Sequence, residues 1–212
     1  MLPCFRRRAV SVVPSAATWR RAHRTRLQPL GHVALIAGPD LPGGAEEIEA
    51  TARQLSGATL LRGAEATVAN TLGAIDGARI AHVAAHGTFR ADSPMFSSLL
   101  LADGRLTIHD LHRLRRAPHR LLLSSCDSGV AAAVGADELL GLASAVMSMG
   151  TTGVLASVSI VNDHATVRLS LHVHDRLGRG DDLAEALADA RQELSDDPGA
   201  LAAALAFVAL GV

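Results

Sequence analysis

The chain alternates short apolar runs with segments in which apolar side chains recur every three or four residues. The runs His32–Ala37, Arg79–Ala85, Leu121–Leu123 and Gly153–Ile160 are bounded by glycine, proline or polar residues, which is typical of buried strands. This alternation predicts an α/β fold, a three-layer sandwich with a mainly parallel central sheet flanked by helices. We expect it to form one domain over residues 31–212.

Helices are expected between the strands, at about 45–55, 65–75, 137–149, 163–177 and 182–194. In the first of them, Glu46, Glu47 and Glu49 lie in the first turns, where the helix dipole favours acidic side chains. The pair Asp103-Gly104 between two apolar stretches predicts a β-hairpin. The segment Ala200–Val212 is predicted to be a closing helix. It is shorter than the roughly 18 apolar residues of a membrane span, so we expect no membrane partner.

Residues 1–30 form an Arg-rich N-terminal segment. Seven arginines precede Asp40, the first acidic residue, although the formal net charge of the whole chain is −1. The chain has no lysine, and the use of Arg alone together with abundant Ala is typical of a GC-rich bacterial genome. We therefore discount the arginines as a sign of nucleic-acid binding and expect no nucleic-acid partner.

The 2 cysteines, Cys4 and Cys126, are far apart and form no C-x-x-C pair. They predict neither a disulfide framework nor a zinc site, and they favour a reducing, cytoplasmic location. His172 and His174 do not share a helix face and so do not form a metal-binding pair. We expect no metal and no cofactor.

Two of the predicted strands end in a chemically reactive side chain followed by glycine or other small residues. Arg79–Ala85 leads to His86-Gly87, and Leu121–Leu123 leads to Ser-Ser-Cys126-Asp-Ser-Gly. The carboxyl ends of parallel strands meet at one edge of a sheet, so neighbouring strands would bring His86 and Cys126 together. Because a free thiol has a pKa of about 8.5, a nearby imidazole would be needed to activate it at neutral pH.

This pair predicts acyl transfer through a thioester. Cys126 would be the nucleophile, and His86 would protonate the leaving amine and later activate water. The backbone N–H groups of Gly87 and Cys126 would form the oxyanion hole. Taken alone, the residues leave other readings open. A free cysteine at a strand end is usually a small buried hydrophobe, and His82 is either a core residue or a partner of the site.

The two strand-end motifs, His82-Val-Ala-Ala-His86-Gly87 and Leu122-Leu-Ser-Ser-Cys126-Asp-Ser-Gly129, resemble those of the CHAT domain family, caspase-like cysteine peptidases of clan CD. Further segments follow in the family's order, among them Ser97-Ser-Leu-Leu-Leu101, Gly135-Ala-Asp-Glu-Leu-Leu-Gly-Leu142 and Val154-Leu-Ala-Ser-Val158. The resemblance implies a caspase-like sandwich. It also implies a cysteine endopeptidase that cleaves a protein or peptide substrate, with Cys126 as nucleophile and His86 as general acid/base.

The resemblance also implies partners. Members of the family often follow helical repeats or sit beside signalling ATPase modules, so we expect such modules on another chain or on a missing upstream part. Ser11-Val-Val-Pro14 resembles a segment that in the family follows an earlier strand, which implies that this chain starts inside the domain. A fragmentary or degenerate CHAT domain that acts as a non-catalytic interaction or signalling module is therefore the alternative function.

Four positions near the expected cleft bear on substrate choice. Ser159 stands where relatives commonly carry Trp, and Ser124 stands where metacaspases have an acid, so the preference of metacaspases for basic residues is not carried over. Asp127 and Asp163 are candidate acidic residues of a substrate pocket. Capping a helix is the alternative role for Asp163.

Overall fold

The computed structural model describes residues 8–25, 31–88, 90, 92–124, 136–158 and 163–212. The main sheet is made of β1 (Ser11–Val12), β2 (Val33–Ala37), β3 (Thr59–Leu61), β4 (Ile80–Ala84), β8 (Arg120–Leu123), β9 (Gly153–Ser157) and β10 (Phe207–Gly211). A second sheet is made of β5 (Gly87–Thr88), β6 (Ser98–Leu101) and β7 (Gly104–Thr107). The α-helices are α1 (Ala16–Arg24), α2 (Pro42–Gln54), α3 (Val68–Ile75), α4 (Ala136–Ser148), α5 (Asp163–Arg179), α6 (Leu183–Glu193) and α7 (Pro198–Ala206). Short 3-10 helices are η2 (Gly63–Glu65), η3 (Pro94–Phe96) and η4 (His109–Arg113).

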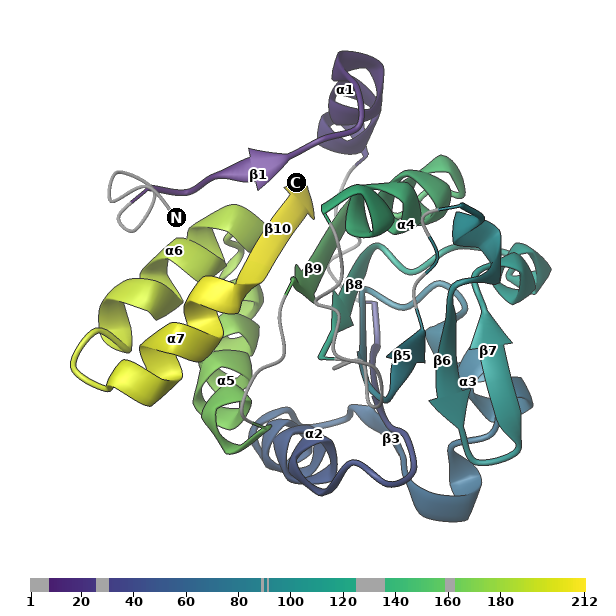
Figure 1. The fold of residues 1–212 in the computed structure, drawn as a ribbon, viewed down its shortest axis with the longest axis horizontal. Coiled ribbons are helices and arrows are strands. Elements are labelled where there is room, and N and C mark those ends of the chain that lie inside the picture. The colour runs from purple at the N-terminus through teal and green to yellow at the C-terminus, as the bar shows by residue number, and fades with distance from the viewer. Residues whose placement is uncertain (1–7, 26–30, 89, 91, 125–135, 159–162) are drawn as a thin grey trace.

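The main sheet runs in the order β1-β10-β9-β8-β4-β2-β3 (Figure 1). Neighbouring strands are parallel except for β10 and β9. The central strands β2, β4, β8 and β9 are buried along their whole length. Strands covered on both faces read as continuous apolar runs, which is why the sequence pattern located them. The predicted mainly parallel sheet is confirmed.

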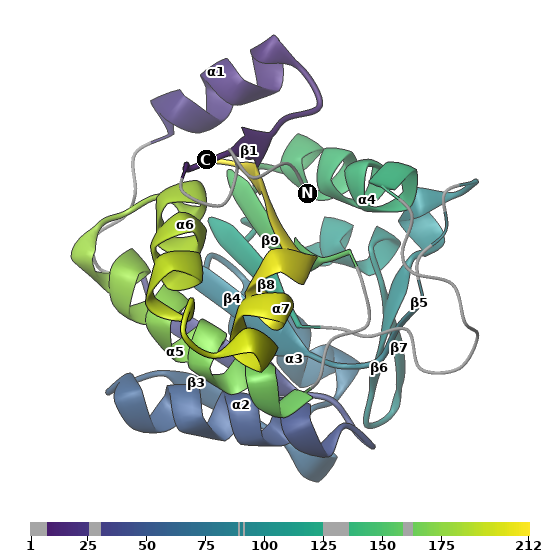
Figure 2. The ribbon, with the colours of Figure 1, turned by 60° about the vertical axis from the view of Figure 1, so that its left-hand side comes forward.

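Helices cover the sheet on both faces and give the expected three layers. One core packs α2, α5, α6 and α7 against the sheet, and the other packs α3, α4 and the second sheet against it (Figures 1 and 2). Successive strand residues alternate between the two cores: Ile80 and Ala84 belong to the first, and Ala81 and Val83 to the second. His82 therefore faces α2 and α5.

The predicted hairpin is also confirmed. It is formed by β6 and β7, with Leu101 opposite Gly104 at its closed end. Gly104 has a φ of 152°, which a residue with a side chain rarely adopts. β5 pairs with the other edge of β6, so the chain that leaves β4 is held against this second sheet.

The closing helix predicted over Ala200–Val212 is wrong beyond Ala206. The chain there becomes β10, which pairs antiparallel with β9. Phe207, Ala209 and Leu210 are buried in this pairing, and that burial outweighs the helical preference of the Ala-rich run. β10 in turn pairs with β1, so part of the Arg-rich segment belongs to the sheet. Within the described ranges, no helix is both long and apolar enough to cross a membrane.

Candidate active site

His86 stands at the carboxyl edge of the main sheet, with Ala85 between it and β4. Its Nε2 lies 2.9 Å from the carbonyl oxygen of Asp40. Because a carbonyl oxygen only accepts, Nε2 carries the hydrogen. Nδ1 is buried and has no hydrogen-bond partner among the described residues. In neutral His86, Nδ1 is therefore the nitrogen that can take up a proton.

The turn from β2 into α2 presents the carbonyl of Asp40. Asp40 has a φ of 56°, in the left-handed region that Asp adopts more readily than most residues. The N–H of Gly38 donates to the carbonyl of Ala84 over 2.8 Å, and a side chain at Gly38 would meet Cβ of Ala85 at 2.6 Å. This turn thus packs directly against the chain that leads to His86 and sets which ring nitrogen carries the hydrogen.

Gly87 follows His86 and opens β5. The N–H of Leu100 donates to the carbonyl of His86 over 2.8 Å, and Gly87 lies opposite Leu99. Bonded and non-bonded pairs alternate along antiparallel strands, so Gly87 occupies a non-bonded pair and its N–H is directed away from β6. The N–H of Gly87, which follows His86 in the chain, is therefore not used in the pairing with β6.

β8, the strand that leads to Cys126, lies beside β4 in parallel register, with Leu123 opposite Val83. The N–H of Ser124 continues the pairing by donating to the carbonyl of Val83 over 3.1 Å. The condition for bringing the two strand ends together, that the two motif-bearing strands are neighbours, is thereby met. Cys126, Asp127 and Ser159 lie outside the described residues, and so does the side chain of Asp163, the first residue of α5. Their predicted roles stay predictions.

A buried polar network lies behind this edge of the sheet, centred on Glu47 of α2. Oε1 of Glu47 is 3.2 Å from Nε2 of His82 and accepts a hydrogen bond from the hydroxyl of Ser124 over 2.7 Å. Nε2 of His82 is also 3.0 Å from the Ser124 hydroxyl. Glu47 and His82 are 1% and 0% exposed. One carboxylate thus ties α2 to β4 and to the end of β8.

Helix α5 completes the network from the opposite side. Ser170 donates a hydrogen bond to Oε1 of Glu47, and Thr166 donates to Oε2 over 3.1 Å. Nε2 of His174 lies 3.1 Å from Nδ1 of His82, with the ring centroids 5.2 Å apart. The open choice for His82 is resolved: it lies in the core and also contacts Ser124, which is two residues before Cys126.

The network sets the protonation of Glu47 and His174. Burial alone would raise the pKa of Glu47, but the hydrogen bond from His82, the charge of His82 and the hydroxyls of Ser170 and Ser124 outweigh it and hold that pKa below its ordinary 4.5. Burial lowers the pKa of His174 well below its ordinary 6.5, and the charges of His82 and Arg79 lower it further. Near neutral pH, Glu47 is ionised and His174 is neutral.

The sequence interpretation of Glu47 as a first-turn partner of the helix dipole is wrong. α2 begins at Pro42, so Glu47 lies in its second turn, on the buried side with Ile48 and Thr51. A sequence signal for this existed, since Glu47 and Thr51 are four residues apart and therefore share a helix face with the apolar positions. In the part of the chain that the structure describes, no three His, Cys, Asp or Glu side chains are grouped to hold a metal ion.

The model of the CHAT domain family matches residues 3–204. The chain belongs to the CHAT domain family. No curated protein matches it. Its membership confirms the resemblance seen in the His82–Gly87 and Leu122–Gly129 motifs.

Solved structures show that this CHAT domain has a caspase-like fold. It is similar to separase in the Saccharomyces cerevisiae separase-securin complex, with a TM-score of 0.67, 15% identity, and coverage of 98% of this chain and 14% of separase. It is also similar to RgpB of Porphyromonas gingivalis in a complex of its pro- and mature domains, with a TM-score of 0.58, 14% identity, and coverage of 91% of this chain and 51% of that one. A structure of the Arg specific cysteine proteinase gingipain R gives a TM-score of 0.54 at 13% identity, covering 89% of this chain and 48% of that one. The CHAT domain thus spans about half of the gingipain chains and a much smaller part of separase.

Proposed function

We propose that this CHAT domain is a cysteine endopeptidase that cleaves a protein or peptide substrate, with Cys126 as nucleophile and His86 as general acid/base. One observation carries the proposal. Nδ1 of His86 is buried at the carboxyl edge of β4 and has no hydrogen-bond partner in the described part of the chain, and β4 pairs with β8, the strand that leads to Cys126. The shared fold with separase and gingipain supports the same reading.

The reaction proceeds in two acyl transfers. Nδ1 of His86 takes the proton of the Cys126 thiol, and the thiolate attacks the carbonyl carbon of the scissile bond. A C–S bond forms, the C–N bond breaks, and the imidazolium gives its proton to the leaving amine. His86 then takes a proton from water, whose oxygen displaces the sulfur, and the thiolate and the second product are released. The hydrogen bond from Nε2 to the carbonyl of Asp40 holds the ring for both steps.

The oxyanion is stabilised by the N–H groups of Gly87 and Cys126. The role of Gly87 is supported by its non-bonded position opposite Leu99. Its N–H makes no hydrogen bond to β6, so it is free to donate one to the substrate. Removing one such donor typically lowers kcat by about 100- to 1,000-fold.

The substrate cleft is proposed to include Asp127, Ser159 and Asp163, of which Asp127 and Asp163 would supply acidic side chains. Helical-repeat or signalling ATPase modules on another chain would deliver the substrate or control access to it.

The buried Glu47 network stabilises the proposed site, because it fixes β4 and the end of β8 relative to each other.

Labelling with a peptidyl acyloxymethyl ketone, a probe that reacts with activated thiolates, tests the proposal. We expect the label on Cys126, no label on Cys126→Ala, and a loss of most labelling in His86→Ala. Cys4→Ser is the matched control for the thiol, since the chain has 2 cysteines. His109→Ala, at an exposed position, is the control for the histidine. Equal labelling of wild type and His86→Ala would support the non-catalytic module instead.

A further inference from the structure

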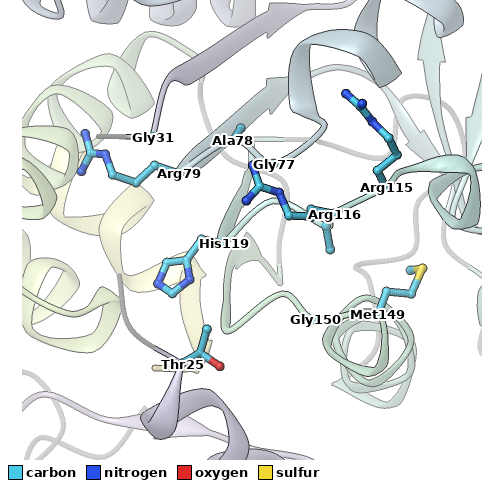
Figure 3. Close-up of a pocket in the computed structure, with 11 residues that line it drawn as sticks. Thr25, Gly31, Gly77, Ala78, Arg79, Arg115, Arg116, His119, Met149 and Gly150 are labelled. Carbon is cyan, nitrogen blue, oxygen red and sulfur yellow. The ribbon is translucent and has the colours of Figure 1, made fainter. Parts of the chain in front are cut away.

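A hollow of about 310 Å³ lies at the amino edge of the main sheet, away from His86. Figure 3 shows the residues that line it. Its lining includes Arg79, Arg115, Arg116 and His119. Arg79 directly precedes β4, and His86 follows the same strand, so the hollow and the candidate active site are at opposite ends of β4. Seven residues at about 3.3 Å each separate them by roughly 20 Å.

The lining of this hollow carries positive charge without a matching negative charge. The described residues that line it include three arginines and no Asp or Glu. Arg115 pairs with Asp76 at 3.0 Å, outside the lining. The guanidinium groups of Arg79 and Arg116 have no ion pair or hydrogen bond within the described residues. Two cationic groups are therefore free to bind an anion.

The backbone around Arg116 is fixed by the turn that precedes β4. The N–H of Gly77 donates to the carbonyl of Arg116 over 2.8 Å, and the N–H of Arg116 donates to Oδ1 of Asp76 over 2.9 Å. Gly77 has a φ of 69°, and a Cβ there would lie 3.0 Å from Nη2 of Arg116. The guanidinium thus lies against the bare backbone of Gly77, as Figure 3 shows. The φ of Gly77 favours glycine, and a side chain there would displace the Arg116 guanidinium.

His119 also lines the hollow, and the charge of Arg79 acts on it. Burial, which is the largest cause, and the charges of Arg120 and Arg79 together lower its pKa from 6.5 to about 4. Acidic neighbours Asp181, Asp182 and Glu185 act on Arg120, whereas Arg79 has no ion pair among the described residues. The ring contacts the hydroxyl of Thr152 at 3.2 Å.

We propose that this hollow binds a phosphate-bearing small molecule through Arg79 and Arg116. A phosphate offers three or more oxygens in a tetrahedral arrangement, so guanidinium groups from different segments can bind it from different sides. A planar carboxylate is satisfied by a single guanidinium. The volume is at the lower end of the range of small-molecule sites, which fits a diphosphate group or a small phosphorylated metabolite.

Isothermal titration calorimetry of the full chain with inorganic pyrophosphate tests the proposal. We expect saturable binding that is weakened about tenfold by Arg79→Gln and by Arg116→Gln, and about 100-fold by the double variant. Arg53→Gln removes an exposed arginine outside the hollow and should leave the affinity unchanged. Titrations with inorganic phosphate and with a nucleoside diphosphate distinguish a site for bare phosphate from a site for a phosphorylated metabolite. A titration with citrate tests whether the hollow binds carboxylates.

NMR titration of His119 provides a second readout that does not depend on heat. A bound anion stabilises the imidazolium, so pyrophosphate should raise the pKa of His119 above its value of about 4. The proposal is overturned if wild type shows no saturable binding, if the double variant binds as tightly as wild type, or if citrate binds as tightly as pyrophosphate. Circular dichroism of each variant confirms that the fold is retained. This inference is independent of the proposed peptidase activity.

Discussion

Nε2 of His82 lies 3.2 Å from Oε1 of Glu47 in the core, between β4 and α2. Neither side chain reaches solvent, and the carboxylate also accepts hydrogen bonds from two other elements through Ser124 and Ser170. A buried charge with this many partners is costly to disturb, because removing one partner leaves the others unsatisfied. The relationship links the stability of the fold to the position of the two strand ends at the candidate active site.

Glu47→Gln should lower the free energy of unfolding by about 2 kcal/mol or more, because an amide cannot replace the charge-assisted hydrogen bonds from His82 and three hydroxyls. Urea denaturation followed by circular dichroism measures this. Glu49→Gln is the matched control, since Glu49 pairs with Arg62 at the surface and such pairs contribute about 0–1 kcal/mol. Equal losses for the two variants would contradict the role given to the network.

Ser124→Ala should lower the free energy of unfolding by about 1–2 kcal/mol, because the hydroxyl both donates to Glu47 and lies 3.0 Å from Nε2 of His82. Ser148→Ala, at an exposed position on α4, should change it by no more than about 0.5 kcal/mol. Thermal unfolding of both variants compares them. A Ser124→Ala variant as stable as wild type would show that the hydroxyl is dispensable.

The stability of the fold should decline in two stages as the pH falls. His174 has a pKa well below 6.5 in the folded state, so below about pH 6.5 the unfolded chain binds more protons and the free energy of unfolding falls. Glu47 has a pKa below 4.5 in the folded state, so its contribution is complete above pH 4.5 and is lost as the pH falls through the folded value.

Urea denaturation between pH 7 and pH 5 measures the first stage. His174→Gln should show a shallower decline than wild type, and His109→Gln, at an exposed position, should follow wild type. Parallel curves for wild type and His174→Gln would contradict the assignment of the decline to His174.

Gly211→Ala should destabilise the fold by more than about 2 kcal/mol. Gly211 has a φ of 88°, and a Cβ there would lie 2.2 Å from the carbonyl oxygen of Thr152. Gly178→Ala on α5 is the control, since nothing lies within 4 Å of its Cβ position, and it should stabilise the helix by about 0.5–1 kcal/mol. Thermal unfolding distinguishes the two, and a tolerated Gly211→Ala would contradict the observed end of β10.

The sheet was predictable from the sequence because its central strands are short apolar runs that stop at glycine or a polar residue. The run Arg79–Ala85 placed β4 and, directly after it, His86. β10 was missed because Ala200–Val212 is uniformly apolar, so it has no periodicity to separate helix from strand. Only the pairing of Phe207–Gly211 with β9 decides its conformation.

The polar network was beyond sequence reasoning for a different reason. Glu47 meets Ser124 and Ser170 across sequence separations of 77 and 123 residues, and a single sequence gives no sign of such contacts. The tautomer of His86 likewise depends on Asp40, 46 residues earlier, whose left-handed backbone directs its carbonyl at the ring. The sequence identified the reactive residues at the strand ends. It did not identify the residues that orient them.

The pH dependence of Cys126 alkylation by iodoacetamide tests the central claim most directly, with Cys4→Ser as the background so that a single thiol reacts. If His86 activates the thiol, the rate in this background stays high well below the ordinary thiol pKa of about 8.5. In the same background, His86→Ala should shift the midpoint up towards about 8.5, while His109→Ala should not move it. Superimposable profiles with and without His86 would contradict a His86–Cys126 dyad.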